Sequence, residues 1–354
     1  MKVIIGGAGI TGLAVGYYLQ QKGIDFEIYE ESHNPSFSTT GIQLASNCHF
    51  VFKELGIYDQ IKEASIEKKT LKVYSENHYL NELSVTNNDD EGTFFIRRSD
   101  LLSTLSSLIP SERIRSSKQI FDISSASSGI SLNVDNHEVK ADLFIDCMGA
   151  NSFIANNSYA TNSTAIWGIS DFSNEFFKSF NNFMFEGMHF VTYPLTKNHT
   201  AYTLVFNNSK FQNHNNKNVT KEDLNKLLKN EFADLINNSN DNVIRSIKGS
   251  NINKWGAGNI IFLGDSAHSI TPHLAQGAAQ GLIDAAYLNR GFSTNIDPEE
   301  FFAKRNLIIN KIRSESKLNK NRYQLGMPFK ILRNIYLKLY KPNYGWLFNS
   351  KYEA

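Results

Sequence analysis

The stretch KVIIGGAGITG, residues 2–12, decides the fold of this 354-residue chain. After Lys2, the residues Val3-Ile4-Ile5 form an apolar run, which is typical of a strand buried on both faces. The run breaks at glycines, and an amphipathic pattern from about Gly9 to Gln21 predicts a helix. The segment from Ile24 to Tyr29 predicts a second strand. The sequence therefore opens on a β-α-β unit.

The glycines of this stretch form a G-x-G-x-x-G motif between a strand and a helix, which indicates a dinucleotide site. Gly7 permits the tight turn, Gly9 lets the backbone approach a pyrophosphate, and Gly12 allows close helix–strand packing. The helix N-terminus adds N–H donors and a partial positive charge. Glu30 ends the second strand, at roughly the 20-residue spacing of an acid that binds ribose hydroxyls. An acidic residue at this position favours binding of NAD or FAD over NADP, because it would repel the 2′-phosphate of NADP.

A second informative stretch, GNIIFLGDSAHSITP, covers residues 258–272. Its buried strand stops at Gly264, which puts Asp265 at the carboxyl end, where open α/β sheets bind ligands. Asp265 can accept hydrogen bonds from a sugar-alcohol chain. Gln276 and Gly277 then begin a helix, whose N-terminus stabilises negative charge on a bound ring.

Composition excludes several classes of function. The formal net charge is +1, whereas a broad nucleic-acid footprint needs a basic excess. Cys48 and Cys147 have no Cys-x-x-Cys spacing, so we expect neither a disulfide framework nor a thiolate zinc site, and the composition fits the cytoplasm. His268 and His273 lack a carboxylate partner in a ligand pattern, so we expect no metal, and a structural role for His268.

The order of predicted elements is parallel α/β at both ends with antiparallel sheet in the middle. It predicts an α/β fold: a Rossmann-like nucleotide-binding domain assembled from separated segments, with a second, antiparallel-sheet domain inserted between them and C-terminal helices. Helical periodicity is expected from Gly41 to Ile61. The expected segments are nucleotide-binding parts at 1–75, 93–160 and 255–297, parts of the inserted domain at 76–92 and 161–254, and a helical region at 298–354.

Three blocks of the chain resemble the FAD-dependent aromatic hydroxylases typified by para-hydroxybenzoate hydroxylase. The first block is the glycine motif, and the second is Arg98-Ser99-Asp100-Leu101, similar to an R-x-x-L motif whose Arg contacts FAD. The third block matches the late motif of that family. In addition, Tyr193-Pro194-Leu195 resembles a Y-P-L sequence in the substrate-domain sheet of the family. The matching residues of the late motif are Gly264-Asp265-Ser266-Ala267-His268, Pro272, Gln276-Gly277, Gly281 and Asp284-Ala285.

The resemblance implies FAD as cofactor, NAD(P)H as reductant and O2 as co-substrate. It also assigns the Rossmann-like segments to an FAD-binding domain and the inserted sheet to a substrate domain. It adds Arg98, Gly264, Asp265, Gln276 and Gly277 to the cofactor site. In the family, a flavin C4a-hydroperoxide transfers oxygen to an aromatic or quinone-type ring, so that the protein supplies orientation and a dry site.

The resemblance also bears on the residues around the flavin. It places Pro272 near the ring and names no catalytic side chain. Residues of the inserted sheet are candidates for the substrate pocket, with core packing as the alternative for each. These candidates are Phe183, Phe185, His189 and Tyr193.

Some positions depart from the family pattern. A middle motif near A-D-G-x-x-S-x-x-R, linked to NAD(P)H use, has Met148 in place of the acid and Ala155 in place of the Arg. Asp146 lies about 6.6 Å away along a strand, too far to substitute. Ala275 replaces a Gly, and Ala279 replaces an Asn near the flavin. These changes keep two alternatives open: an FAD oxidoreductase without oxygen insertion, of the reductase or dehydrogenase type, or a non-catalytic flavin-binding protein.

The segment 328–341 predicts a basic amphipathic helix. Such a helix either covers the core of its own protein, which we favour, or makes peripheral membrane contact, in which case the protein is membrane-associated. A quinone-type substrate would suit the second alternative. The sequence leaves the oligomeric state open.

Overall fold

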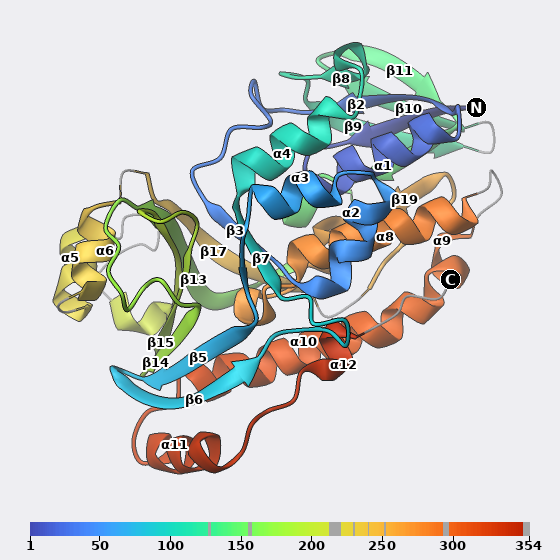
Figure 1. Cartoon of the computed structure of the whole chain (residues 1–354). Helices are drawn as coiled ribbons and strands as arrows, with labels where there is room; N and C mark the ends of the chain where they lie inside the picture. Colours follow the sequence, from blue (N-terminus) through green and yellow to red (C-terminus); the bar gives the residue numbers. More distant parts are fainter. Residues whose placement is uncertain are drawn as a thin grey trace.

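Two sheet-based lobes form the molecule, and the long helix α10 (Ala303–Tyr323) runs along both (Figure 1). The computed structural model describes residues 1–126, 129–154, 158–211, 221–228, 231–239, 241–250, 253–292 and 297–349. The expected α/β fold with a parallel sheet, an antiparallel substrate sheet and C-terminal helices is confirmed.

The first lobe is built on a six-stranded sheet of order β18-β19-β12-β1-β2-β8, parallel except for the β18–β19 pair. Its strands are β1 (Lys2–Gly6), β2 (Asp25–Tyr29), β8 (Ile114–Arg115), β12 (Leu143–Asp146), β18 (Gly256–Ala257) and β19 (Ile260–Phe262). The helices that pack with it include α1 (Ile10–Gln21), α4 (Arg98–Ser107) and α8 (Gly277–Gly291).

The apolar runs noted in the sequence form the centre of this lobe. Val3, Ile4 and Ile5 of β1 are fully buried, because β1 lies between β2 and β12 with helices against it. Helix α1 is apolar nearly all round, as expected for a helix enclosed by β1, β2, α4 and α8. Strands from three distant parts of the sequence thus share one core.

The second lobe is a seven-stranded sheet of order β17-β13-β16-β15-β14-β5-β6, antiparallel except for the β14–β5 pair. One face carries the short helices α5 (Lys221–Leu227) and α6 (Glu231–Asn237), which are visible at the left in Figure 1. The strands are β5 (Thr70–Ser75), β6 (His78–Ser84), β13 (Ser158–Ser170), β14 (Asn181–Phe185), β15 (Met188–Pro194), β16 (Thr200–Asn207) and β17 (Val243–Ser250). The boundary expected at 75/76 is wrong, because β5 already belongs to this sheet.

Two smaller sheets complete the fold. One has the order β11-β10-β9, from His137–Ala141, Gly129–Val134 and Ile120–Ala126. The other has the order β3-β7-β4, from Gly41–Leu44, Thr93–Arg97 and Ile66–Lys68. The helix expected from Gly41 is corrected here: residues 41–44 pair with β7, and helical structure begins only at Ser46–Cys48, followed by α2 (His49–Glu54) and α3 (Tyr58–Glu63).

The C-terminal region is helical, as expected. Besides α10 it contains α9 (Pro298–Phe301), α11 (Phe329–Leu339) and α12 (Gly345–Phe348). Among the described residues, no helix is long and apolar enough to cross a lipid bilayer.

Candidate functional site

The glycine motif forms a turn that only glycine permits. Gly7 has φ +96°, and a Cβ there would lie 2.6 Å from the carbonyl oxygen of Cys147. A Cβ on Gly12 would lie 2.0 Å from the Gly7 oxygen, so the helix packs directly on the turn. Gly9 has no atom within 4 Å of its Cβ position, which leaves its backbone open to a ligand.

Glu30 lies beside this turn, at the carboxyl end of β2. Its carboxylate accepts hydrogen bonds from the backbone N–H of Ala8 (2.9 Å) and of Ser32 (2.8 Å). The acid therefore joins the glycine turn to the end of the neighbouring strand. Its role toward ribose hydroxyls stays a prediction.

The turn before Asp265 is held by a buried carboxylate, Asp284 of α8. Gly264 (φ +60°) donates its N–H to Asp284 (3.0 Å), and His268 Nε2 lies 2.6 Å from the same oxygen. Arg305 of α10 binds the other oxygen through Nε (3.1 Å) and Nη2 (2.6 Å). Burial by itself would raise the pKa of Asp284, but His268 and Arg305 outweigh it and lower that pKa to about 2.

His268 and the N–H of Gly264 share one oxygen of Asp284, so His268 supports the Gly264–Asp265 turn, in line with the structural role expected of it. Asp265 is the first residue of the short helix α7 (Asp265–His268), and its side chain opens into a cavity. Arg305 is a functional residue that sequence reasoning missed, since it stands in a helix without a motif.

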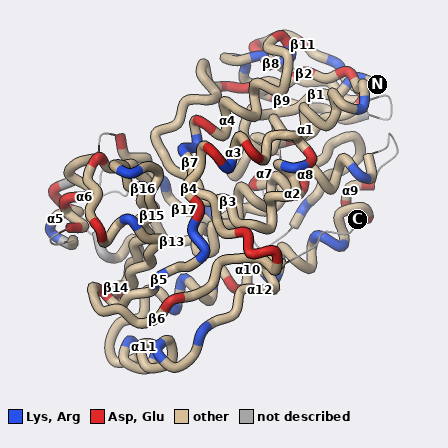
Figure 2. The backbone as a smooth tube through the Cα atoms, viewed as in Figure 1, with Lys and Arg blue, Asp and Glu red and all other residues tan. Residues whose placement is uncertain are grey.

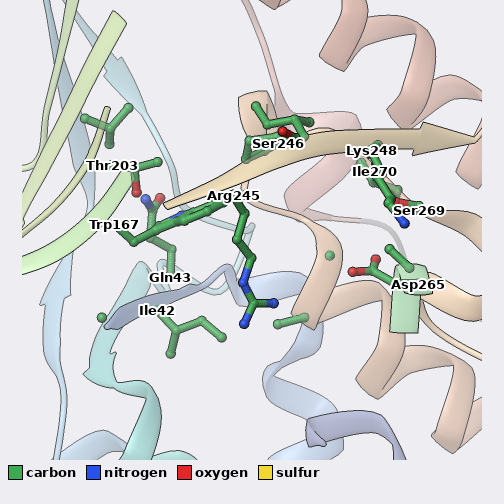
Figure 3. A pocket seen from close by; sticks show the side chains of 18 of the residues that line it. Ile42, Gln43, Trp167, Thr203, Arg245, Ser246, Lys248, Asp265, Ser269 and Ile270 are labelled. Atoms are coloured by element: carbon green, nitrogen blue, oxygen red, sulfur yellow. Dashed lines mark hydrogen bonds between the residues drawn. The ribbon is translucent and has the colours of Figure 1, made fainter. Parts of the chain in front are cut away.

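A cavity of about 630 Å³ lies between the two lobes. Figure 3 shows the side chain of Arg245, from β17, reaching into it between Ile42 and Asp265. Lining residues from the first lobe and its loops include Gly41, Ile42, Gln43, Asp265, Pro272, Ala275 and Gly277; those from the sheet include Trp167, His189, Tyr193, Thr203, Arg245 and Lys248.

Two guanidinium groups approach this region. Arg98, at the start of α4, is held by its backbone N–H to Thr40 (2.9 Å). Burial lowers the pKa of Arg98, and Arg245 lowers it further, whereas Asp265 and Glu30 act in the opposite direction. An anionic ligand between the two arginines would relieve their repulsion. Arg245 was missed, because nothing in the sequence of β17 indicates which of its residues face the cavity.

A smaller apolar cavity of about 90 Å³ adjoins the first. The two share the lining residues Gln43, His189, Val191, Pro272 and Ala275. The other lining residues come from β5, β7 and β14, from the segments between elements and from the C-terminal helical region: Ala45, Leu71, Val85, Thr93, Phe180, Asn182, His273, Leu274, Tyr323, Tyr344, Leu347 and Phe348. No motif in the sequence indicates that residues of the C-terminal region line this cavity.

Of the four candidates for the substrate pocket, two lie on the cavity face of the sheet and two on the opposite face. His189 and Tyr193 of β15 line the cavities. Phe183 and Phe185 of β14 do not: their rings pack on Phe232 of α6, at centroid distances of 4.9 and 5.6 Å. Their assignment to the pocket is therefore wrong, because they point to the opposite face of the sheet.

The pairing of the strands gives the reason. Phe183 pairs with Phe190, and Met184 pairs with His189, so His189 and Phe183 lie on opposite faces. On β14 it is Asn182 that faces the small cavity.

Two buried histidines lie at the junction of the cavities. The His189 and His273 rings are 5.1 Å apart, and no described residue hydrogen-bonds to either ring nitrogen of His273. Burial, helped by Lys320, lowers the pKa of His273 to about 3. Burial and His273 hold the pKa of His189 well below its usual range. Both imidazoles are therefore neutral at pH 7, and each offers one donor and one acceptor.

Gln276 and Gly277, predicted to bind cofactor, begin α8 as expected. Gly277 lines the large cavity. The side-chain oxygen of Gln276 accepts hydrogen bonds from Asn47 (2.8 Å) and Gln280 (2.9 Å), so this side chain fixes the start of the helix from within the protein.

The altered middle motif lies at the end of β12. Asp146 is fully buried and accepts hydrogen bonds from Met148 N–H (2.9 Å), Ser266 Oγ (2.8 Å) and Ser152 Oγ. Its carboxylate is occupied by the protein's own donors and does not take the place of the missing acid. Ala155 lies outside the described residues.

Across the part of the chain that the structure describes, no three His, Cys, Asp or Glu side chains are grouped to hold a metal ion.

The chain is similar to known proteins in both sequence and structure. The sequence profile of the family described as "FAD binding domain" matches residues 1–297. Monooxygenase 1 of Arabidopsis thaliana is 27% identical over 322 residues, which cover 84% of this chain and 80% of that protein. The 3-amino-4-hydroxybenzoate 2-monooxygenase of Streptomyces cremeus is 22% identical over 316 residues, covering 81% and 77%. The solved structure of Klebsiella pneumoniae HpxO complexed with FAD and uric acid has a TM-score of 0.83 at 17% identity, covering 96% and 93% of the two chains.

Proposed function

Since the chain belongs to the FAD-binding domain family and is an FAD-dependent monooxygenase of it, we propose that it hydroxylates a small aromatic or quinone-type ring, with NAD(P)H as reductant and O2 as co-substrate. The observation that carries the proposal is the apolar cavity beside Pro272, with two neutral buried histidines at the place where it joins the large cavity.

The residues present fit FAD. Gly7 and Gly12 leave no room for a Cβ, and Gly9 leaves its backbone uncovered. Arg98 and Arg245 supply positive charge, and Asp265 and Gly277 line the large cavity. We infer that these residues, with Glu30, Gly264, Pro272 and the α8 N-terminus started by Gln276, hold the cofactor. When bound and reduced, FAD supplies the activation of O2.

The walls of the small cavity support a neutral or weakly acidic ring as substrate. Phe180, Leu347 and Phe348 enclose it with apolar surface and exclude water. A carboxylate deep in this cavity would find no guanidinium or ammonium group among its lining residues. A phenol or an N-heterocyclic ring, in contrast, can pair its O–H or N–H with an imidazole.

His273 is the residue we assign to the substrate hydroxyl. Its unpartnered ring nitrogens lie in a buried site, where a hydrogen bond is worth more than in water. A neutral ring nitrogen can accept a hydrogen bond from the substrate hydroxyl, which orients the ring and raises its electron density. The lowered pKa of His273, about 3, makes it a weak base, so we assign it this hydrogen bond and not removal of the whole proton.

The main alternative is an FAD oxidoreductase without oxygen insertion. The observation that favours it is the middle motif, where Met148 replaces the acid and the buried Asp146 is occupied by Ser152 and Ser266. A non-catalytic flavin-binding protein is the remaining alternative.

The test is an assay of the FAD-loaded protein in air. NADH and NADPH oxidation is followed with and without a panel of phenols, quinones and N-heterocycles, and products are identified by mass. We expect oxidation stimulated by a ring substrate and a product heavier by one oxygen. Oxidation with a reduced but unoxygenated product would establish the alternative, and flavin that neither nicotinamide reduces would establish a non-catalytic protein.

The variant His273→Gln tests the assigned residue. We expect its turnover to fall about tenfold, because the hydrogen bond to the substrate hydroxyl is displaced, and to recover at high pH, where a phenol ionises in solution. FAD binding should be unchanged. His199→Gln is the matched control, since His199 is half-buried and lines neither cavity. Equal activity of the two variants would contradict the role of His273.

A further inference from the structure

The helix α11 exposes its apolar face to solvent. Leu332 is 66% exposed and Leu339 is 84% exposed. The neighbouring apolar side chains on and beside the helix are also exposed: Met327, Phe329, Ile331, Ile335, Tyr336 and Tyr340. A helix that covers the core of its own protein has the reverse arrangement. Leu337 is buried in a cluster with Val73, Leu80, Leu83 and Met184, so the expectation that this segment covers the core holds for that side chain and is wrong for the larger apolar face.

The orientation of α11 is fixed by polar contacts on its inner side. Arg333 is buried and donates to Ser75 Oγ (3.0 Å) and to the carbonyl oxygens of Arg322 (3.2 Å) and Tyr323 (3.3 Å). Asn81 of β6 donates to the carbonyl oxygen of Leu337 (2.7 Å). These contacts would be lost if the helix turned its apolar face inward, so the outward apolar face is a defined part of the fold.

The surroundings of this face are basic. Residues 316–350 contain seven Lys and Arg and no Asp or Glu, although the whole chain carries a net charge of only +1. Lys338 and Lys341 are exposed, whereas Lys330 pairs with Glu76 of the adjoining hairpin. Figure 2 shows Lys and Arg along α11, with no acidic residue on the helix.

We propose that this face binds the surface of an anionic lipid bilayer. An apolar stripe with flanking lysines lies in the interface plane, where the side chains of Leu332 and Leu339 enter the acyl region and the ammonium groups reach the headgroups. Phe329, Tyr336 and Tyr340 suit the same depth, since aromatic side chains favour this interface. The helix has 11 residues, which is too short to span a membrane.

Charge argues against a second copy of this chain as the occupant. In a two-fold contact the same patch meets itself, so Lys338 and Lys341 would face their own copies without an acidic partner on the helix. Anionic headgroups complement these lysines. The proposal does not rest on the proposed function, because none of the α11 residues lines the cavities.

The test is co-sedimentation of the FAD-loaded protein with vesicles. One set contains phosphatidylcholine alone, and the other contains about one third phosphatidylglycerol. We expect sedimentation with the anionic vesicles, weakened by salt, and at least about a tenfold loss of binding in Leu339→Glu. Lys338→Gln combined with Lys341→Gln should weaken binding to anionic vesicles. FAD binding is measured in parallel to show that each variant is folded.

Leu307→Glu is the matched control, since Leu307 of α10 is 76% exposed and lies outside the patch. This variant should bind vesicles like the unchanged protein. Equal loss in both Glu variants, or no sedimentation of the unchanged protein at low salt, would overturn the proposal. A dimer in solution that Leu339→Glu converts to monomer would overturn it too, because a second copy would then cover the face.

Discussion

At the scale of single residues, two positions of the site carry unfavourable free energy: Ala275 has a strained backbone conformation, and Arg245 lies near a second arginine. Ala275 has φ +52°, a left-handed conformation that a glycine adopts more easily, and it lines both cavities. The resemblance noted above has a glycine at this place. Arg245 brings a second positive charge near Arg98. Both features cost free energy in the protein without ligand.

Replacing Ala275 by Gly should stabilise the protein. Relief of the left-handed alanine is worth about 1 kcal/mol, part of which the more flexible unfolded chain offsets, so we expect a gain of about 0.5 kcal/mol in the free energy of unfolding. Urea denaturation measures it. Ala278→Gly, within α8, is the control and should lose about 1 kcal/mol. The same loss in both variants would contradict the argument.

Replacing Arg245 by Gln should weaken FAD binding about tenfold, equivalent to ~1.4 kcal/mol, because the cofactor phosphates lose one cationic partner. Titration of the apoprotein with FAD, followed by flavin fluorescence, gives the Kd. The loss should shrink as salt is added. Lys140→Gln, on the surface of β11, removes the same charge elsewhere and should leave the Kd unchanged. An unchanged Kd in Arg245→Gln would refute the role assigned to Arg245.

At the scale of elements, a buried ion pair at the start of α10 anchors this helix to α8 of the first lobe. Arg305 and Asp284 are both fully enclosed, and removal of one partner leaves an uncompensated charge. The same carboxylate holds Gly264, so the pair supports the cofactor turn as well as the helix.

Arg305→Met should lower the free energy of unfolding by about 3–5 kcal/mol, because Asp284 then stays buried without its guanidinium partner. Denaturation with and without FAD measures the change. Combining Arg305→Met with Asp284→Asn should cost clearly less than the sum of the single changes, as coupled partners do. Strict additivity would show that the pair is not coupled.

The sequence predicted the fold correctly where a segment has a pattern that fits only one kind of element. The strands β1, β12 and β19 are short continuous apolar runs, and the glycine motif fixes the turn after the first. It failed where both faces of a strand are apolar: Phe183 and His189 look equally suitable for a pocket, and only the pairing register separates them. It also failed for α11. An amphipathic pattern predicts a helix with one apolar and one polar face, but it does not predict which face packs against the rest of the protein.

At the scale of the whole molecule, three buried histidines make stability depend on pH. Burial lowers the pKa of His49 to about 4 against the opposing effect of Glu91, lowers that of His273 to about 3, and holds that of His189 well below its usual range. The unfolded chain binds these protons below about pH 6.5, whereas the folded chain does not. Stability is therefore fully present above pH 6.5 and is lost as the pH falls.

Each such histidine costs about 1.4 kcal/mol between pH 7.5 and 5.5, so the three together should lower the free energy of unfolding by about 4 kcal/mol. Urea denaturation at the two pH values measures the difference. His49→Gln should remove about a third of it, while His33→Gln, an exposed control, should remove none. A free energy of unfolding that stays constant over this range would show that the buried imidazoles are not the source.

The strand order of the first lobe has a consequence for how the protein is made. β1 is synthesised first, but its neighbour β12 begins at Leu143, β19 at Ile260, and the cation for Asp284 arrives only with Arg305. A ribosome must therefore complete most of the chain before the central sheet can close, and until then the apolar β1 and α1 stay exposed. We therefore expect newly made chains to expose this apolar surface to chaperones, and a premature stop before Ile260 to leave the N-terminal glycine motif in an incomplete sheet.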